Sequence, residues 1–97
     1  MYAVINHLHF SRPADDFRAA IEQDGLPLLA SLPGFVDFLF VKTSEDRAVV
    51  VLVWRDAASA DNGAKTFGPT WFAKHLAPHL ASEQQRSGGP VLVHHRP

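Results

Sequence analysis

Hydrophobic and polar side chains alternate near the start of the chain, in the segment YAVINHLHF at 2–10. In an extended chain this alternation places two sets of side chains on opposite faces. They are Val4, Asn6, Leu8 and Phe10 on one face, and Ala3, Ile5, His7 and His9 on the other. A period of two residues is that of a β-strand, so we predict the first strand here.

The hydrophobic period changes to that of a helix after Pro13, a residue well placed at the first position of a helix. The apolar residues at helical spacing are Phe17, Ala20, Ile21 and Leu28. The segment LPGF at 32–35 ends this pattern. Because Gly25 and Pro27 lie inside it, we expect a first helix that is kinked or split.

Two β-rich runs follow, GFVDFLFVK at 34–42 and RAVVVLVW at 47–54, with the polar segment TSED between them. Two such runs joined by a short polar loop are typical of an antiparallel hairpin. They are the predicted second and third strands.

A second helical region follows the hairpin. Asp56 can cap a helix that runs to about Lys65, the GP pair at 68–69 is expected to break it, and Pro69 can start a second helical piece. The segment GGPVLVHH at 88–95 is the predicted fourth strand.

The predicted order of elements is therefore β-α-β-β-α-β. This order is that of the ferredoxin-like arrangement, in which two helices cover one face of a four-stranded antiparallel sheet. We predict an α+β fold that forms a single domain over residues 1–97.

The sheet face that the helices leave uncovered is also apolar. The third strand is apolar on both sides, and in FVDFLF the side chains of Phe35 and Leu39 are expected on one face with Phe38 and Phe40 on the other. A sheet with one face in water should alternate apolar with polar residues. We therefore expect a second copy of the chain to cover this face, in an isologous homodimer that forms through the sheets.

Composition and charge exclude several classes of partner. The formal charge is −1 and the nine Lys and Arg are scattered, so the chain has no basic stripe for nucleic acid. The longest wholly apolar run, at 48–54, is far shorter than the roughly 20 residues of a membrane-spanning helix. Because no signal-like stretch precedes it, we expect a soluble cytoplasmic protein without a membrane partner.

The chain offers little for a cofactor or a metal. It has no cysteine, and it contains no dinucleotide-binding glycine pattern, P-loop or nucleophile elbow. His75 and His79 have the i, i+4 spacing of helical zinc ligands, but Pro78 is expected to end the helix before His79. Histidines of the first and fourth predicted strands could also meet, or could simply lie at the rim of the sheet. We predict no cofactor and no required transition metal.

The layout resembles the dimeric α+β barrel superfamily, and in particular the small domains called antibiotic-biosynthesis-monooxygenase-like. The features that carry the resemblance are LPGF before the second strand, a strand that ends in Trp54 followed by RDAASA, a broken second helix, and GPVLVHH in the last strand. That superfamily includes cofactor-free quinol-forming oxygenases, haem-degrading enzymes and proteins of unknown activity. The resemblance implies a dimer, and it leaves the reaction open among these classes.

The resemblance also indicates Asn6 and His75 as a catalytic pair. In the haem-degrading members, an Asn of the first strand and a His of the second helix flank the cavity between sheet and helices, together with a Trp. Asn6 and His75 match in position, whereas Lys65 stands where that Trp is expected. This departure argues against haem degradation.

These side chains suit the oxidation of a phenol or hydroquinone. The imidazole of His75 could take the hydroxyl proton and leave an electron-rich anion that reduces O₂. The amide of Asn6 could donate to the developing oxyanion. Phe67, Trp71 and Phe72 could form the walls of an aromatic binding site.

Packing offers an alternative for the same helix. The apolar residues Phe72, Leu76 and Leu80 recur every four positions, which suits the core-facing stripe of a helix. Trp71 and His75 are then expected on the flank of that stripe. Trp54 is expected in the core. Arg12, Arg55 and the segment EQQR are expected on a solvated surface.

We therefore predict a cofactor-independent monooxygenase that acts on a small aromatic or quinol-like compound. Two alternatives remain, a noncatalytic ligand-binding or accessory dimer and a haem-binding or haem-degrading protein. All three predict a small hydrophobic or aromatic ligand between sheet and helices.

Overall fold

An antiparallel sheet of four strands forms one layer of the protein. The computed structural model describes residues 1–95 and residue 97. The strands lie in the order β2-β3-β1-β4. Their bounds are Tyr2–His9 for β1, Phe35–Ser44 for β2, Arg47–Trp54 for β3 and Gln85–Pro90 for β4.

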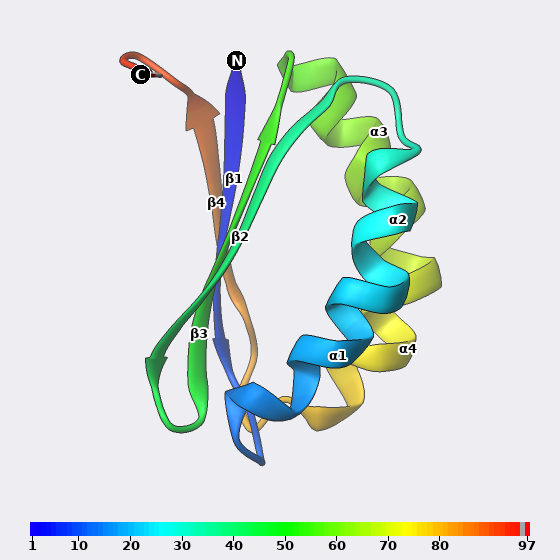
Figure 1. Ribbon diagram of the computed structural model, residues 1–97, viewed down its shortest axis with the longest axis vertical. Coiled ribbons are helices and arrows are strands. Elements are labelled where there is room, and N and C mark those ends of the chain that lie inside the picture. The colour runs from blue at the N-terminus through cyan, green and yellow to red at the C-terminus, as the bar shows by residue number, and fades with distance from the viewer. Residues whose placement is uncertain (96) are drawn as a thin grey trace.

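Two helical segments form the second layer and cover one face of this sheet (Figure 1). The first consists of η1 (Ala14–Phe17), α1 (Arg18–Ala20), η2 (Ile21–Gly25) and α2 (Leu26–Ala30). The second consists of α3 (Ala57–Phe67), η3 (Gly68–Phe72), α4 (Ala73–His75) and η4 (Ala77–His79). The predicted β-α-β-β-α-β order and ferredoxin-like fold are confirmed. In the part of the chain that the structure describes, no helix has the length and apolar character needed to cross a membrane.

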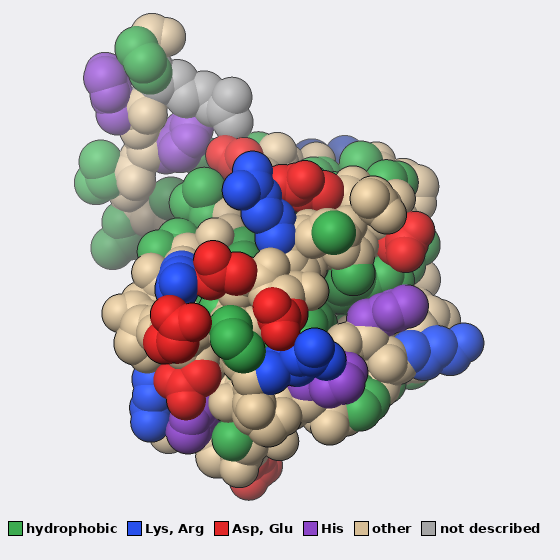
Figure 2. Space-filling view, turned by 60° about the horizontal axis from the view of Figure 1, so that its bottom comes forward, with side chains coloured by type: hydrophobic (Ala, Val, Ile, Leu, Met, Phe, Trp, Pro, Cys, Tyr) green, Lys and Arg blue, Asp and Glu red, His purple; other side chains and the backbone are tan. Residues whose placement is uncertain are grey.

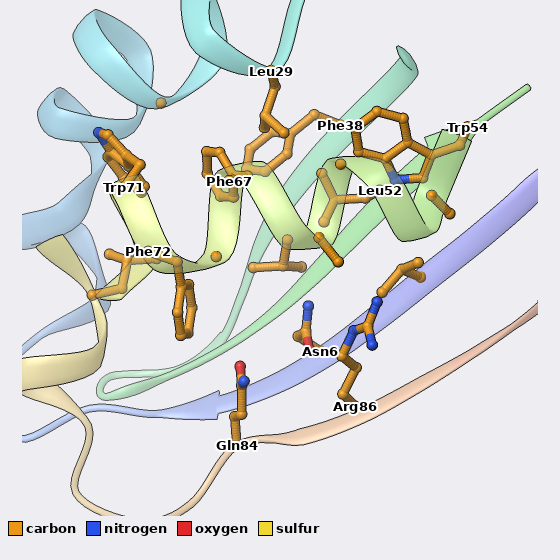
Figure 3. Close-up of a pocket in the computed structure, with 18 of the residues that line it drawn as sticks. Asn6, Leu29, Phe38, Leu52, Trp54, Phe67, Trp71, Phe72, Gln84 and Arg86 are labelled. Atoms are coloured by element: carbon orange, nitrogen blue, oxygen red, sulfur yellow. The ribbon is translucent and has the colours of Figure 1, made fainter. Parts of the chain in front are cut away.

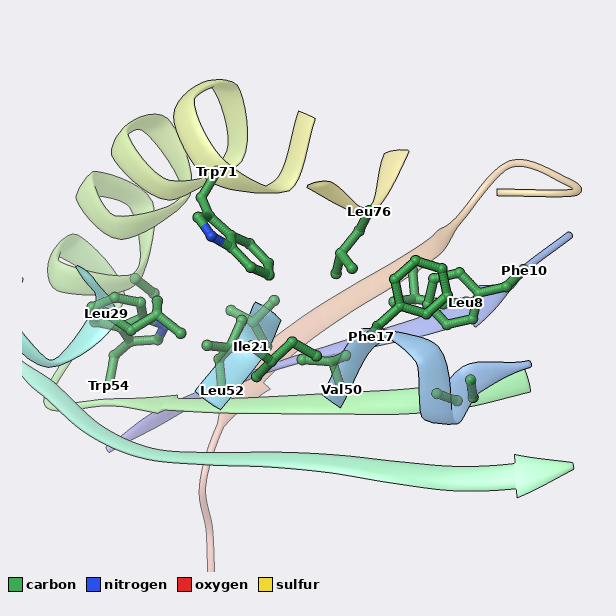
Figure 4. Close-up of a cluster of buried hydrophobic side chains, with 14 residues drawn as sticks. Leu8, Phe10, Phe17, Ile21, Leu29, Val50, Leu52, Trp54, Trp71 and Leu76 are labelled. Atoms are coloured by element: carbon green, nitrogen blue, oxygen red, sulfur yellow. The ribbon is translucent and has the colours of Figure 1, made fainter. Parts of the chain in front are cut away.

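The hydrophobic core lies between the two layers (Figure 4). Alternate residues of β1 and β3 point into it, and the helical segments supply the facing side chains. Trp54 is 2% exposed, which confirms its predicted place in the core. The large buried side chains drawn there include Leu8, Phe10, Phe17, Ile21, Leu29, Val50, Leu52, Trp71 and Leu76.

The outer face of the sheet is also apolar, as the sequence predicts. Leu39 and Val41 of β2 are 56% and 46% exposed. The outward residues of the neighbouring strand β3 are Val49, Val51 and Val53, and all are half-buried. The predicted homodimer would remove this face from water.

One assignment to the faces of β2 is wrong. Phe35 does not share the face of Leu39, because the register shifts between Phe35 and Asp37. Phe35 pairs with Trp54 and meets its ring edge-on, at 5.6 Å between centroids. The extra residue of the bulge thus returns Phe35 to the inner face.

The predicted fourth strand is displaced along the chain. β4 runs over Gln85–Pro90 rather than 88–95, and its last pair joins Tyr2 to Pro90. Beyond that pair, the backbone N–H of Val91 donates one further hydrogen bond to the carbonyl oxygen of Met1, at 2.9 Å. Leu92 and Val93 are 90% and 88% exposed, and the end of the chain projects from a body on which acidic and basic side chains are interspersed (Figure 2).

The second helix is not broken at Gly68 and Pro69 as predicted. α3 runs on into η3, a π-helical turn with Pro69 in its first positions. A π-helical turn is wider than an α-helical one and absorbs the proline without ending the helix. The predicted end before His79 is confirmed, since α4 stops at His75 and Pro78 lies in the 3₁₀ turn η4.

Candidate functional site

A cavity of about 240 Å³ lies between the sheet and the helices (Figure 3). It is the space in which the sequence places a ligand. The cavity is bounded by β1 and β3 below, by α3 and η3 above, and by β2 and η2 at one side. Its lining residues are Val4, Asn6, Ile21, Gly25, Leu29, Phe38, Val50, Leu52, Trp54, Ala60, Gly63, Ala64, Phe67, Gly68, Trp71, Phe72, Leu76, Gln84 and Arg86.

Aromatic rings form much of the cavity wall. Phe67 stacks on Trp71 with 5.3 Å between ring centroids and an interplanar angle of 23°. Phe38 and Trp54 line the same space from the sheet. The three predicted substrate-binding residues, Phe67, Trp71 and Phe72, therefore lie together at the cavity. Such a wall favours a flat, apolar ligand.

The start of α3 is fixed by the predicted cap. The Asp56 Oδ1 atom accepts a hydrogen bond from the backbone N–H of Ser59, at 2.8 Å. This bond stabilises the charged carboxylate and holds the pKa of Asp56 below its ordinary value. Because Ala60, Gly63 and Ala64 of α3 line the cavity, the cap also fixes the cavity's upper wall.

The two π-helical turns meet beside the cavity. A Cβ atom built at Gly25 of η2 would lie 3.1 Å from Cζ2 of Trp71, which belongs to η3. A side chain at this position would push the indole outward, so glycine suits this close approach. Trp71 is 6% exposed, so it faces the core instead of flanking the stripe as predicted. The extra residue in the π-helical turn rotates Trp71 inward.

Polar groups line the cavity along β1 and the approach to β4. Asn6 of β1 and Arg86 of β4 are direct partners in the antiparallel register, and Gln84 lies two residues before Arg86. Figure 3 shows all three side chains below the helix that carries Phe67. The Asn6 Oδ1 atom is buried without a hydrogen-bond partner, as is the Trp71 Nε1 atom. Unpaired buried polar atoms are costly, and a bound ligand is one way to satisfy them.

His75 does not join Asn6 at the cavity. Its side chain is exposed, and its ring stacks on that of Trp71 with 4.9 Å between centroids. Because Trp71 lines the cavity, His75 reaches the site only through this indole. The expected arrangement, with Asn6 and His75 facing one another across the cavity, is not found.

The sequence analysis placed EQQR on a solvated surface, and Arg86 is indeed exposed, but it missed that Gln84 and Arg86 also line the cavity. The signal was obscured by the displaced fourth strand. With β4 beginning at Gln85, Arg86 lies opposite Asn6 and shares its inward face. Arg86 forms no ion pair with any carboxylate in the described part of the chain, so its guanidinium is available to an anion.

Metal-ligating groups do not gather among the residues that the structure describes, since no three His, Cys, Asp or Glu side chains lie close enough to share an ion. The ring of His79 lies 5.5 Å from that of Phe17, away from His75 on Trp71. His9 contacts Asp46 at 3.1 Å on the sheet's rim. His9, His75 and His79 therefore lie in separate environments, although His75 and His79 are only four residues apart in the sequence.

Solved structures share this architecture. SnoaB of Streptomyces nogalater, a cofactor-independent oxygenase, matches with a TM-score of 0.79 and 15% identity over 96% of this chain and 94% of that one. ActVA-Orf6 of Streptomyces coelicolor, a monooxygenase in complex with Nanaomycin D, matches with a TM-score of 0.77 and 12% identity over 99% and 91%. The chain has the fold of the antibiotic biosynthesis monooxygenases. This confirms the predicted resemblance at the level of the fold.

A haem-type ligand occurs on the same fold. A variant of MhuD with two manganese protoporphyrin IX bound per active site matches with a TM-score of 0.75 and 18% identity over 100% of both chains. No protein-family model matches the sequence, and no curated protein matches it. The likeness therefore concerns the fold, and the choice of reaction depends on the chemistry of this cavity.

Proposed function

We propose that the protein is a cofactor-independent monooxygenase for a small phenol or hydroquinone. The observation that carries the proposal is one cavity with aromatic walls, an unpaired Asn6 amide oxygen and an Arg86 guanidinium free of carboxylate partners in the described chain. A ring compound with one oxygenated edge matches both parts. SnoaB, a cofactor-independent oxygenase, supports the proposal by sharing the fold.

The cavity favours the anion of such a compound. None of the described side chains that line it is a carboxylate or an imidazole, so the phenol proton leaves to water instead of to a lining base. The Asn6 Oδ1 atom can accept the hydroxyl hydrogen bond of the neutral phenol. Once the proton has left, the positive charge of Arg86 stabilises the phenolate, and the Nδ2 group of Asn6 donates a second hydrogen bond to it. A phenolate held in an apolar space is a good electron donor to O₂.

The reaction balances without an added reductant. The phenolate passes an electron to O₂, and the resulting superoxide joins a hydrogen-bearing ring carbon beside the hydroxyl group to form a peroxide. Loss of water then leaves a carbonyl oxygen on that carbon. One phenol and one O₂ thus give one quinone and one H₂O.

Haem is the less favoured ligand. The volume of about 240 Å³ lies below the roughly 300–1,000 Å³ typical of pockets for drug-sized ligands, and a macrocycle needs the upper part of that range. No histidine lines the cavity within the described chain, and Lys65 replaces the expected tryptophan. Haem binding would therefore need a wider cavity and a new position for His75.

The test is oxygen uptake with a series of phenols and hydroquinones, with the product identified by mass spectrometry. Asn6→Leu and Arg86→Leu should each lower kcat/KM by about 100-fold, the cost of losing one oxyanion donor. Arg47→Leu is the matched control, because Arg47 is an exposed arginine of β3 outside the cavity. It should oxidise substrate at the wild-type rate.

Three results would contradict the proposal. Equal rates in the Asn6 and Arg86 variants and the wild type would remove these residues from the reaction. Tight binding of phenols without oxygen uptake would leave the accessory ligand-binding protein. One-to-one binding of haemin, followed by its breakdown with a reductant, would favour haem degradation.

We also propose that two copies pack sheet to sheet. The support is the apolar outer face, with Leu39 and Val41 half-exposed beside the valines of β3. Water in contact with this face costs free energy that a second identical face would recover. The cavity opens on the opposite side of the sheet, so a dimer of this kind leaves it accessible.

A further inference from the structure

A second hollow of about 360 Å³ lies between β2 and the first helical segment. It is an open groove with an apolar floor, formed by Ile21, Leu26, Phe38 and Phe40. Phe38, Phe40 and Leu26 are only half-buried, so their apolar surface meets water. The proposed reaction assigns no role to this groove.

Ion pairs border the groove. Lys42 of β2 contacts Asp15 of η1 at 2.7 Å, and Arg18 contacts Glu22 along the helix at 2.9 Å. The charges of the rim are thus neutralised in pairs. The groove therefore suits an uncharged, apolar group better than an ion.

The groove and the cavity share a wall. Ile21 and Phe38 are the residues that line both hollows. Ile21 is 5% exposed and held in the π-helical turn η2, whereas Phe38 is a half-buried residue of the edge strand β2. Phe38 is thus the part of the wall with room to move.

Ring contacts distinguish Phe38 from its neighbours on β2. Phe35 meets the ring of Trp54, and Phe40 lies 6.4 Å from the ring of Phe10. Phe38 makes no ring contact of this kind with any residue that the structure describes. A change of its χ1 rotamer therefore breaks no aromatic pair.

The position of this wall fixes which part of a ligand it meets. Asn6 and Arg86 lie on β1 and β4, whereas Phe38 lies on β2 at the other edge of the sheet. A phenol whose hydroxyl group contacts Asn6 and Arg86 therefore directs its opposite ring carbon toward Phe38. A substituent on that carbon reaches the shared wall first.

We infer that the groove is a second subsite, which takes an uncharged alkyl substituent opposite the hydroxyl group of a phenol, and that Phe38 sets the length admitted. This inference rests on the proposed function, because it places the ring in the cavity. The continuity of the two hollows through one movable side chain supports it. Phe38 is in this sense a specificity-determining residue.

The experiment measures the affinity of 4-alkylphenols by calorimetry, from phenol to 4-hexylphenol. In the wild type each methylene that enters the groove should tighten binding about fourfold. In Phe38→Trp the larger ring should close the passage, so the ratio of the hexylphenol to the phenol affinity should fall by about tenfold or more. Because Phe38 also lines the cavity, the ratio of the two affinities is the readout for this variant, whereas Leu26→Trp, which lies outside the cavity lining, should keep the wild-type affinity for phenol.

Three comparisons make the result specific. Leu26→Trp fills the groove without touching the cavity lining, so it should reproduce the loss for 4-hexylphenol even if Phe38→Trp folds poorly. Leu39→Ala, on the outer face of the same strand, should leave the ratio of the hexylphenol to the phenol affinity at its wild-type value. 2-Hexylphenol should gain little from its chain, because its substituent does not point at Phe38.

The outcomes separate the inference from the function it rests on. If phenols bind but both tryptophan variants keep the wild-type dependence on chain length, the subsite is overturned and the proposed reaction stands. If phenol does not bind the wild-type cavity at all, the proposed function fails, whatever hexylphenol does. A fall in the affinity ratio in both tryptophan variants supports the subsite, while oxygen uptake tests the reaction separately.

Discussion

Alanine at Gly63 and alanine at Gly68 should change the stability of the protein in opposite directions. Both glycines line the cavity from the second helical segment, and Gly68 has helical dihedral angles, φ −57° and ψ −60°. A Cβ atom at Gly68 would meet no atom within 4 Å. A Cβ atom at Gly63 would lie 2.2 Å from Cη2 of Trp54 and 2.4 Å from Cζ2.

The magnitudes follow from these contacts. Replacing a helical glycine by alanine stabilises by about 0.5–1 kcal/mol, because the unfolded chain loses conformational freedom. For Gly68→Ala this gain should raise Tm by roughly 2–8 °C in a domain of this size. At Gly63 the same gain is opposed by overpacking against Trp54, which is 2% exposed and has no space to withdraw. Overpacking of this kind costs about 1–3 kcal/mol.

The assay compares the two variants with each other by urea unfolding. The helix gain is common to both, so the difference between their free energies of unfolding isolates the clash, at about 1–3 kcal/mol. Near-ultraviolet circular dichroism should show a disturbed Trp54 environment in Gly63→Ala only. Equal stability of the two variants would refute the close packing of Trp54 on α3.

Three further predictions concern assembly, pH and His75. Light scattering at micromolar concentration should give about twice the chain mass of 10.7 kDa, and a monomer across that range would exclude the sheet-to-sheet dimer. The pKa values of Asp15, Asp46 and Asp56 are held below 3.8 by hydrogen bonds from Lys42, His9 and the Ser59 backbone, respectively. These bonds therefore add stability that is present above about pH 4 and is lost as the pH falls further, through the lowered pKa values. Tm should fall as the pH drops below about 4, and a Tm that stays constant there would contradict these bonds. His75→Ala should keep the wild-type Tm because the ring is exposed, and should lower kcat/KM less than Asn6→Leu does; unfolding of this variant would show a structural role instead.

The order of the elements could be predicted because local patterns determine it. The alternation in β1, the apolar run of β3 and the cap at Asp56 each act over a few neighbouring residues. Gly34 of LPGF likewise has φ 79°, a left-handed conformation that turns the chain into β2 after the helix has ended. Each of these features depends on residues that are close together in the sequence, so it can be predicted without knowledge of the folded structure.

The cavity was predicted less well because it depends on register and on helix pitch. Arg86 faces the ligand space only because β4 pairs it with Asn6, and no local pattern fixes that register. Trp71 turns inward because η3 is a π-helical turn, whereas the sequence was interpreted with α-helical spacing. His75 was expected at the cavity because of the family resemblance, and it lies outside on the indole.

Because residues 68–72 form a π-helical turn, the geometry of the site depends on the number of residues in this segment. Such a turn holds one residue more than the α-helical turn that would replace it. Deleting one residue there, such as Thr70, would restore the α-helical pitch and bring Trp71 one position closer to Phe67 along the helix. The stack of Phe67 on Trp71 would then change its geometry although both residues were kept. In related sequences, a gap of one position in this window should therefore mark a change of ligand more reliably than a substitution at Trp71.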